Sequence, residues 1–281
     1  MKPIQLIIIV AIFVAILTGC SNTEEAESIL SQETYQVIVE DSEKQTTDIR
    51  HHDEKKSEES AQPVNASIDN NKTIVIDPGH ASTRTTDYEP VGPGAEEMKM
   101  ATVIGTRGVS TGIYEYALVM DIANKLRDEL INRGYTVVLT KDSEDVVLSN
   151  IERAQIANEA NADAFIRLHA DASDNAADSG AMAMIISENN PYAAGLYQDS
   201  SVLAESVLSA YCSKTGFSNL GVEKTDNMTG NNWSQVPCVL LELGYMTNPN
   251  DDQMMATQDF RDAMAIGVAD GIDRYFETIS E

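Results

Sequence analysis

The sequence TIVIDPGH occupies residues 73–80. Its first four residues are β-branched, and a Pro-Gly pair follows shortly after them. This pattern predicts a short buried strand that ends in a tight turn, with a histidine directly after the turn. Similar apolar runs recur along the rest of the chain, and helical patterns separate most of them, so this first strand sets the expectation for the whole fold.

The remaining elements follow from hydrophobic periodicity. Further strands are expected at residues 135–140, 164–169, 182–186 and 236–243, and helices at residues 115–133, 150–161, 201–215 and 259–279. Alternating strands and helices predict a three-layer α/β fold, with a mostly parallel sheet flanked by helices. In such sheets the functional side chains gather at the carboxyl ends of the strands.

The charge of the chain excludes one class of function. The 281 residues include 45 Asp and Glu but only 19 Lys and Arg, for a formal net charge of −26. The excess is not confined to one end, because residues 73–281 alone carry 32 acidic and 13 basic residues. A surface this acidic repels a polyphosphate backbone, so we expect no nucleic-acid partner.

The N-terminus resembles a bacterial lipoprotein signal. Lys2 precedes an apolar run over residues 6–17, which is too short to cross a bilayer comfortably. The run ends in Leu-Thr-Gly-Cys, similar to the lipobox, so residues 1–19 are expected to be removed and Cys20 to be lipidated. An ordinary signal peptide, or a membrane anchor with a chance cysteine, remains the alternative.

Residues 20–71 have the composition of an acidic disordered tether, rich in Ser, Glu, Thr, Gln, Lys and Asn. His51 and His52 lie in this stretch, where they are interpreted as solvated rather than as metal ligands. Tethering to a membrane lipid through Cys20 would hold the rest of the chain on the outer face of the cell membrane, toward the cell wall.

The two other histidines of the chain lie at equivalent places. His80 follows the strand at residues 73–77, and His169 ends the strand at residues 164–169. One such histidine is usually a satisfied polar residue, but two at equivalent strand ends suggest a shared metal. A catalytic zinc ion needs three protein ligands and one open position, so a carboxylate is the natural third ligand.

Two glutamates stand out as candidates. Glu115 opens the first long helix, where it could point at a site or simply cap the helix. Glu242 lies in the apolar sequence VLLELG, residues 239–244. A carboxylate there is costly to bury unless it is paired or bound to a metal, although an outward-facing strand residue is the alternative.

The series IVIDPGH, a Glu that opens a helix, RLHAD and VLLELGYMTN resembles the zinc-dependent N-acetylmuramoyl-L-alanine amidases of the bacterial cell wall. The resemblance covers about residues 73–276 and implies a zinc amidase catalytic domain over residues 72–281. It further implies that His80, Glu115 and His169 bind Zn²⁺ and that Glu242 is the catalytic carboxylate.

The reaction implied by this resemblance is hydrolysis of the amide between N-acetylmuramic acid and the L-Ala of the stem peptide in peptidoglycan, using water activated by zinc. A zinc peptidase that cuts within the stem peptide is one alternative. A lipoprotein that binds peptidoglycan or a partner without cutting it is another, and a solute-binding lipoprotein is a third. A protein activator is left open.

Several features depart from the usual pattern of that family. Arg167 stands where a Ser is usual and Asp171 where an Asn is frequent, and the long segment 81–112 could cover the site as an autoinhibitory element. Trp233, the only tryptophan, is either a packing residue or a wall of the substrate groove. Asp77 is either a turn residue or a group that orients His80.

Overall fold

The computed structural model describes residues 71–280. The expected signal peptide, Cys20 and all but the last residue of the expected tether lie outside this range. Among the described residues, every helix is too short or too polar to cross a membrane.

Strands and helices alternate along most of the described chain. The strands are β1 (Thr73–Pro78), β2 (Tyr88–Pro90), β3 (Met98–Met100), β4 (Thr136–Leu139), β5 (Ala164–Asp171), β6 (Ala181–Ile185), β7 (Asn219–Lys224) and β8 (Cys238–Tyr245). The helices are α2 (Glu115–Asn132), α3 (Asn150–Glu159), α4 (Tyr197–Thr215), α5 (Thr229–Asn232), α6 (Pro249–Met255) and α7 (Gln258–Ser280), with a short 3₁₀ helix at Ala194–Leu196.

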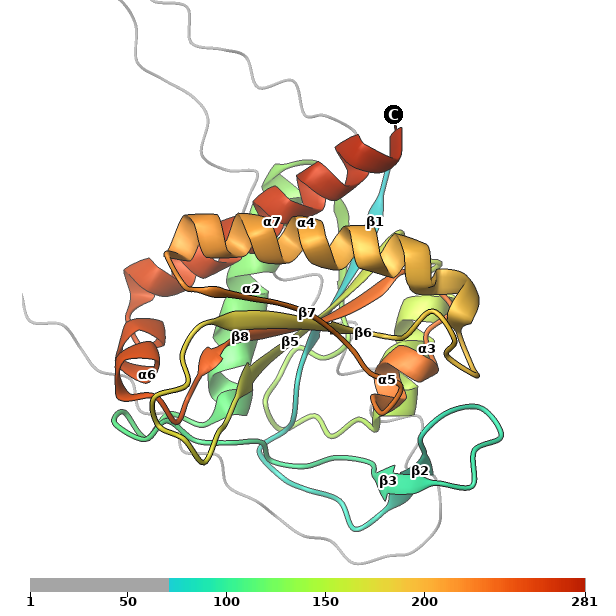
Figure 1. The fold of residues 1–281 in the computed structure, drawn as a ribbon, viewed down its shortest axis with the longest axis horizontal. Coiled ribbons are helices and arrows are strands. Elements are labelled where there is room, and N and C mark those ends of the chain that lie inside the picture. The colour runs from blue at the N-terminus through green and yellow to red at the C-terminus, as the bar shows by residue number, and fades with distance from the viewer. Residues whose placement is uncertain (1–70, 281) are drawn as a thin grey trace, which may run out of the picture. The chain divides into compact units, whose positions relative to one another are not determined.

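Six strands form one sheet in the order β4-β1-β5-β8-β6-β7 (Figure 1). Strands β4, β1, β5 and β8 run parallel to one another, whereas β6 is antiparallel to β8 and parallel to β7. The predicted α/β fold with a mostly parallel sheet is therefore confirmed. Strands β1, β5 and β8 are neighbours, so their carboxyl ends meet at one edge of the sheet.

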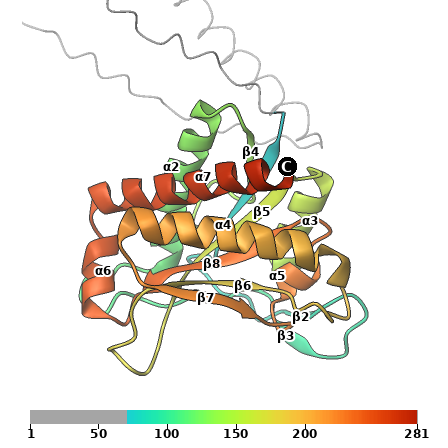
Figure 2. The same cartoon turned by 45° about the horizontal axis from the view of Figure 1, so that its top comes forward.

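The helices cover both faces of this sheet. Helices α4 and α7 run side by side and pack with α2 on one face, while α3 and α5 lie on the other (Figure 2). Alternate residues of β1 serve the two faces, because Ile74 and Ile76 join the α2/α4/α7 core and Val75 joins the smaller α3 core. Each of these three side chains is fully buried, which is worth about 1.5–3 kcal/mol apiece.

Each strand and helix expected from periodicity is present, with ends that differ by a few residues. The β2–β3 hairpin, β7, α5 and α6 were not expected from the sequence. Strand β7 (NLGVEK) has no apolar run, because it is a sheet edge with largely exposed side chains. Cys212 and Cys238 are both free and buried, so a disulfide between them is excluded.

Candidate metal centre

Three side chains that are far apart in the sequence meet at the carboxyl edge of the sheet. The Nε2 atom of His80 lies 2.9 Å from Oε1 of Glu115, and Nδ1 of His169 lies 3.1 Å from that same oxygen. The two imidazole nitrogens are 3.1 Å apart. One nitrogen from each histidine and one carboxylate oxygen thus face a common point, as the ligands of a metal ion do.

The fold brings these residues together in a simple way. His80 lies two residues beyond the end of β1, and His169 belongs to the neighbouring parallel strand β5. Glu115 is the first residue of α2, whose amino end lies at the same edge. Strand ends and a helix start therefore supply all three side chains from a rigid framework.

Two glycines allow this close approach. A Cβ atom on Gly79 would lie 2.4 Å from the His169 ring, so only hydrogen fits there. A Cβ on Gly105 would lie 2.5 Å from Oε2 of Glu115, and Gly105 also has a φ of +83°, which favours glycine. Larger residues at either position would displace a candidate ligand.

Backbone groups orient two of the three side chains. The Nδ1 atom of His80 lies 3.0 Å from the carbonyl oxygen of Val103, which places the proton on Nδ1 and leaves the Nε2 lone pair free. Glu115 accepts hydrogen bonds from the backbone N–H groups of Thr106 and Ala170. Since neither donor belongs to the first turn of α2, the carboxylate is not a helix cap, and that alternative is wrong.

The protonation states suit a metal site. Burial would raise the pKa of Glu115, but its contacts with the His169 and His80 imidazoles outweigh burial and hold the pKa of Glu115 well below its usual range. Burial lowers the pKa of His169 to about 4, although the adjacent Glu115 opposes this shift. A carboxylate and a neutral imidazole are the forms that bind a divalent ion.

The donor set fits zinc in number, type and spacing. A tetrahedral zinc ion with bonds of about 2.0–2.1 Å keeps its ligand atoms about 3.3 Å apart. The separations of 2.9–3.1 Å in this cluster are within a few tenths of an ångström of that value. Two histidines and one carboxylate also leave a fourth position open, as catalytic zinc sites require.

Glu242 lies beside this cluster with a buried oxygen that has no partner. It pairs in register with His169 on the next strand, so both side chains project from the same face of the sheet. Among the described residues nothing donates a hydrogen bond to its Oε2 atom. Burial raises the pKa of Glu242 well above its usual value, and the nearby carboxylates of Glu115 and Asp171 raise it further.

A buried ion-pair network of Asp77, Arg153 and Arg167 lies next to the candidate ligands. The carboxylate of Asp77 accepts from Arg153 at 2.6 Å and from Arg167 at 3.0 Å, and all three side chains are at most 3 % exposed. Burial opposes ionisation of Asp77, but the two guanidinium groups and Thr140 hold its pKa well below the usual range. The hydrogen bonds of Asp77 thus go to these groups rather than to His80, and it is more than a turn residue.

Arg153 connects this network to the first histidine. Its guanidinium donates to the carbonyl oxygens of Pro78 and His80, at 2.8 and 2.9 Å. The ammonium of Lys141 donates to the same His80 oxygen. Burial lowers the pKa of Lys141 to about 8, and Arg153 adds to the effect. Lys141 was not singled out from the sequence as a site residue. Its only distinguishing feature in the sequence is that it directly follows the strand expected at residues 135–140.

The segment 81–112 forms part of the site. Residues 100–103 line a cavity of about 50 Å³ together with His80, His169, Leu148, Asn150 and Arg153. Glu89 anchors the segment, because its carboxylate accepts from the first backbone N–H groups of α3 at Asn150 and Ile151. Since Val103 also orients His80, the segment helps to shape the site itself.

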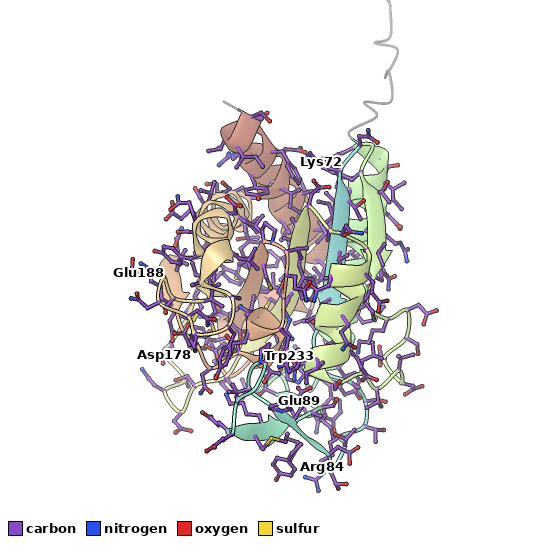
Figure 3. The ribbon with its side chains drawn as sticks, turned by 90° about the vertical axis from the view of Figure 1, so that its right-hand side faces the viewer. Lys72, Arg84, Glu89, Asp178, Glu188 and Trp233 are labelled. Atoms are coloured by element: carbon purple, nitrogen blue, oxygen red, sulfur yellow. The ribbon has the colours of Figure 1, made fainter. Side chains whose placement is uncertain are left out.

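Trp233 is a packing residue that also anchors this segment. Its indole Nε1 donates to the carbonyl of Pro90 at 3.0 Å, and its ring packs against the smaller core. Figure 3 shows Trp233 close to Glu89, a residue of β2. The interpretation of Trp233 as packing is therefore supported.

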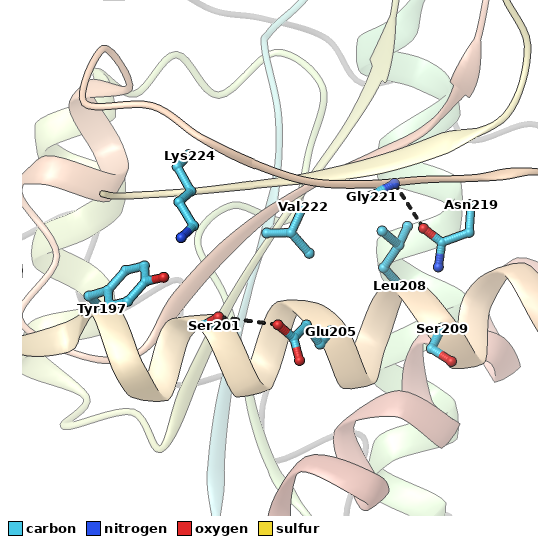
Figure 4. Close-up of a pocket in the computed structure, with 9 residues that line it drawn as sticks. All are labelled: Tyr197, Ser201, Glu205, Leu208, Ser209, Asn219, Gly221, Val222 and Lys224. Carbon is cyan, nitrogen blue, oxygen red and sulfur yellow. Dashed lines mark hydrogen bonds between the residues drawn. The ribbon is translucent and has the colours of Figure 1, made fainter. Parts of the chain in front are cut away.

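A separate groove of about 460 Å³ lies between α4 and the edge strand β7 (Figure 4). Its ionisable lining residues include Glu205 and Lys224, and it contains no histidine or cysteine. The Lys224 ammonium lies over the Tyr197 ring, 4.9 Å from its centroid. The groove shares no lining residue with the cluster of His80, Glu115 and His169 and is not part of the metal centre.

Comparison with known proteins places this site in a family context. The family model described as N-acetylmuramoyl-L-alanine amidase matches residues 74–274. The N-acetylmuramoyl-L-alanine amidase LytC of Bacillus subtilis (strain 168) is 28 % identical over 207 residues, which are 73 % of this chain and 36 % of LytC. A protein named "Probable cell wall amidase LytH", from Staphylococcus epidermidis, is 26 % identical over 220 residues, covering 77 % of this chain and 64 % of LytH.

The fold is also shared with a solved structure. The N-acetylmuramyl-L-alanine amidase Ami1 from Mycobacterium abscessus superposes with a TM-score of 0.66 at 25 % sequence identity, and the match covers 73 % of this chain and 98 % of Ami1. The chain thus spans little more than a third of LytC and just under two thirds of LytH, but nearly all of the Ami1 structure.

Proposed function

The chain belongs to the N-acetylmuramoyl-L-alanine amidase family, and on that premise we propose that it hydrolyses the amide between N-acetylmuramic acid and the L-Ala of the stem peptide in peptidoglycan. The observation that carries the proposal is the meeting of His80, Glu115 and His169 at the carboxyl edge of the sheet. The family match indicates the substrate, and the cluster of candidate metal ligands explains how an amide could be cleaved.

We propose that these three residues hold Zn²⁺. When bound, zinc supplies a Lewis acid that polarises an amide carbonyl and activates water at neutral pH. The chain's own contribution is to fix the ligands. Val103 sets the tautomer of His80, and the two backbone donors to Glu115 hold its carboxylate in place. Hydrogen bonds of this kind, which hold the ligand side chains in place, strengthen metal binding in comparable sites.

Glu242 is the proposed general base and acid. Its free, buried Oε2 can accept a proton from the attacking water and pass it to the leaving amine of L-Ala. Burial raises the pKa of Glu242 above its usual value, in the direction that favours proton exchange by a catalytic carboxyl group. The position opposite His169 puts the carboxyl beside the candidate metal ligands.

The proposed activity predicts a specific product. We expect the purified protein, incubated with peptidoglycan sacculi and Zn²⁺, to release intact stem peptides that begin with L-Ala. Mass spectrometry of the soluble fraction identifies these peptides, and a chelator should abolish their release, because an amide is a poor electrophile without a Lewis acid.

The same assay separates the competing functions. New amino ends other than that of L-Ala would assign the site to a zinc peptidase acting within the stem peptide. Zinc binding without any cleavage would favour a peptidoglycan-binding protein or an enzyme that needs an activator. The Oε2 atom of Glu242, buried beside the ligand cluster with no hydrogen-bond partner among the described residues, favours catalysis over binding alone.

We further propose that the enzyme acts in the cell envelope, held on the outer face of the membrane through acylated Cys20. The support is the lipobox-like sequence of residues 17–20 and the location of peptidoglycan outside the membrane. Replacement of Cys20 by alanine should move the protein from the membrane fraction to the medium or the soluble extract. Membrane retention of that variant, detected by immunoblotting, would point to an uncleaved anchor instead.

A further inference from the structure

His80 has an unusual backbone conformation for a residue with a side chain. Its φ is +60°, and among residues 71–280 only Asn71 and Asn161 share a positive φ outside glycine. L-residues rarely adopt this left-handed region, although histidine tolerates it better than most. The conformation occurs where the chain turns away from β1, after Pro78 and Gly79.

Two buried cations bind the carbonyl oxygen of this one residue. Arg153 donates to it through Nη2 at 2.9 Å, and Lys141 donates through Nζ. The two side chains come from different elements, because Arg153 is on α3 and Lys141 follows the end of β4. Only 2 % of Arg153 and 4 % of Lys141 is exposed, so neither group is an incidental surface contact.

The other contacts of Arg153 and Lys141 show which of the two is buried mainly for the sake of His80. Arg153 is also paired with Asp77, so its burial has a structural reason of its own. For Lys141, by contrast, the His80 carbonyl is the single hydrogen-bond acceptor that the described part of the chain provides. A buried ammonium is costly unless it is compensated, and its one direct partner is the backbone of a candidate metal ligand.

We propose that Lys141 and Arg153 are positioning residues for His80, which hold its left-handed backbone so that Nε2 faces Glu115 and His169. The inference deepens the proposed function, since it rests on His80 being a ligand. A carbonyl oxygen has two lone pairs, and the two cations occupy both. These hydrogen bonds fix the peptide group after His80. The hydrogen bond from Nδ1 to the Val103 carbonyl fixes the imidazole at its other end, so Nε2 is oriented toward Glu115 and His169.

Replacement of Lys141 by methionine is the sharpest test. Methionine keeps an unbranched side chain of similar length but removes the donor, and the Asp77–Arg153 pair remains intact. We expect Lys141→Met to weaken zinc binding about 10-fold or more, as loss of an outer-shell contact does in other sites, with the thermal unfolding transition retained. Competition with a chromophoric chelator measures the affinity, and Lys141→Arg, which restores a donor, should recover most of it.

Control variants separate positioning from general packing. Lys125→Met removes a lysine whose partner is the surface carboxylate of Asp262, so zinc affinity should not change. Arg153→Lys can be compared with Arg261→Lys, because Arg261 is also buried and also donates to a backbone carbonyl and a carboxylate. Only the Arg153 variant should lose zinc affinity, while both lose stability.

A second readout does not depend on metal. In the metal-free protein, ¹⁵N-labelled imidazole signals should show His80 in one state with Nδ1 protonated, and Lys141→Met should shift or split that signal. If the unaltered protein binds no zinc but its His80 signal changes in Lys141→Met, the proposed function fails and the positioning role stands. Unchanged His80 signals in Lys141→Met, or unchanged zinc affinity in a protein that does bind zinc, would overturn the positioning role.

Discussion

Replacement of Glu242 by glutamine is expected to lower kcat on peptidoglycan by about 10²–10⁴-fold, the usual contribution of general acid–base catalysis. Glutamine keeps the shape of the side chain but cannot take up the proton of the attacking water. Zinc content should be unchanged, because the free Oε2 of Glu242 has no hydrogen bond to His80, Glu115 or His169. Release of L-Ala-terminated peptides and metal analysis of the same preparation measure the two quantities.

The stability of this variant should not fall with its activity. The pKa of Glu242 is raised in the folded protein, so folding favours its protonated form. Stability is therefore lost as the pH rises above the unfolded pKa of a glutamate, and a neutral glutamine avoids that loss. At pH 7 the metal-free Glu242→Gln protein should unfold at the same denaturant concentration as the unaltered chain, or at a higher one.

A glutamate on an exposed strand provides the control. Glu223→Gln, on the edge strand β7, should alter neither activity nor stability, because its side chain is exposed. A Glu242→Gln protein that has lost zinc or unfolds more easily would assign Glu242 a structural role. Undiminished turnover in that variant would move the general base to another residue.

The layout of the fold could be predicted because its core elements repeat a strong pattern. Largely apolar runs such as those of β1 and β8 reflect burial on both faces of a parallel sheet, and the helix patterns between them reflect burial on one side. The elements that were missed have no such signature. Strand β7 is exposed, and the β2–β3 hairpin is held by polar contacts of Glu89 and Trp233, which leave no periodicity in the sequence.

The candidate ligands could be named because strand ends converge in this type of sheet. The residues that orient them could not, because their role depends on backbone atoms. Val103 acts through its carbonyl oxygen, and Lys141 acts on the carbonyl of His80. Neither function has a side-chain signature, since any residue offers a carbonyl and a lysine after a strand is ordinarily solvated.

Arg167 shows how a departure from a family pattern can be explained by the interior. Its buried guanidinium joins Asp77 to the amide oxygens of Asn150 and Asn231. Gly230 makes room for it, because a Cβ there would lie 2.4 Å from the guanidinium. Arg167 therefore stabilises the interior beside the site. Within the described chain its hydrogen bonds go to this network rather than to the candidate ligands.

Replacement of Asp77 by asparagine is expected to lower the free energy of unfolding at pH 7 by about 3–5 kcal/mol, the usual effect of removing one partner from a buried ion pair. Two guanidinium groups, on Arg153 and Arg167, would remain buried without a carboxylate. Urea unfolding followed by circular dichroism measures the change. A surface pair provides the comparison, since Asp262→Asn frees only the partly exposed Lys125 and should cost less than about 1 kcal/mol.

The pH dependence identifies the source of this stability. The folded pKa of Asp77 lies well below the unfolded value, so its contribution is complete above the ordinary aspartate pKa of about 4 and is lost as the pH falls below it. The gap between Asp77→Asn and the unaltered protein should therefore be constant at neutral pH and narrow in acid. A gap that stays constant down to about pH 2 would mean that shape, rather than charge, accounts for the loss. Because Asp77 also fixes Arg153, zinc affinity should fall in the same variant, which connects the stability of this network to the geometry of His80.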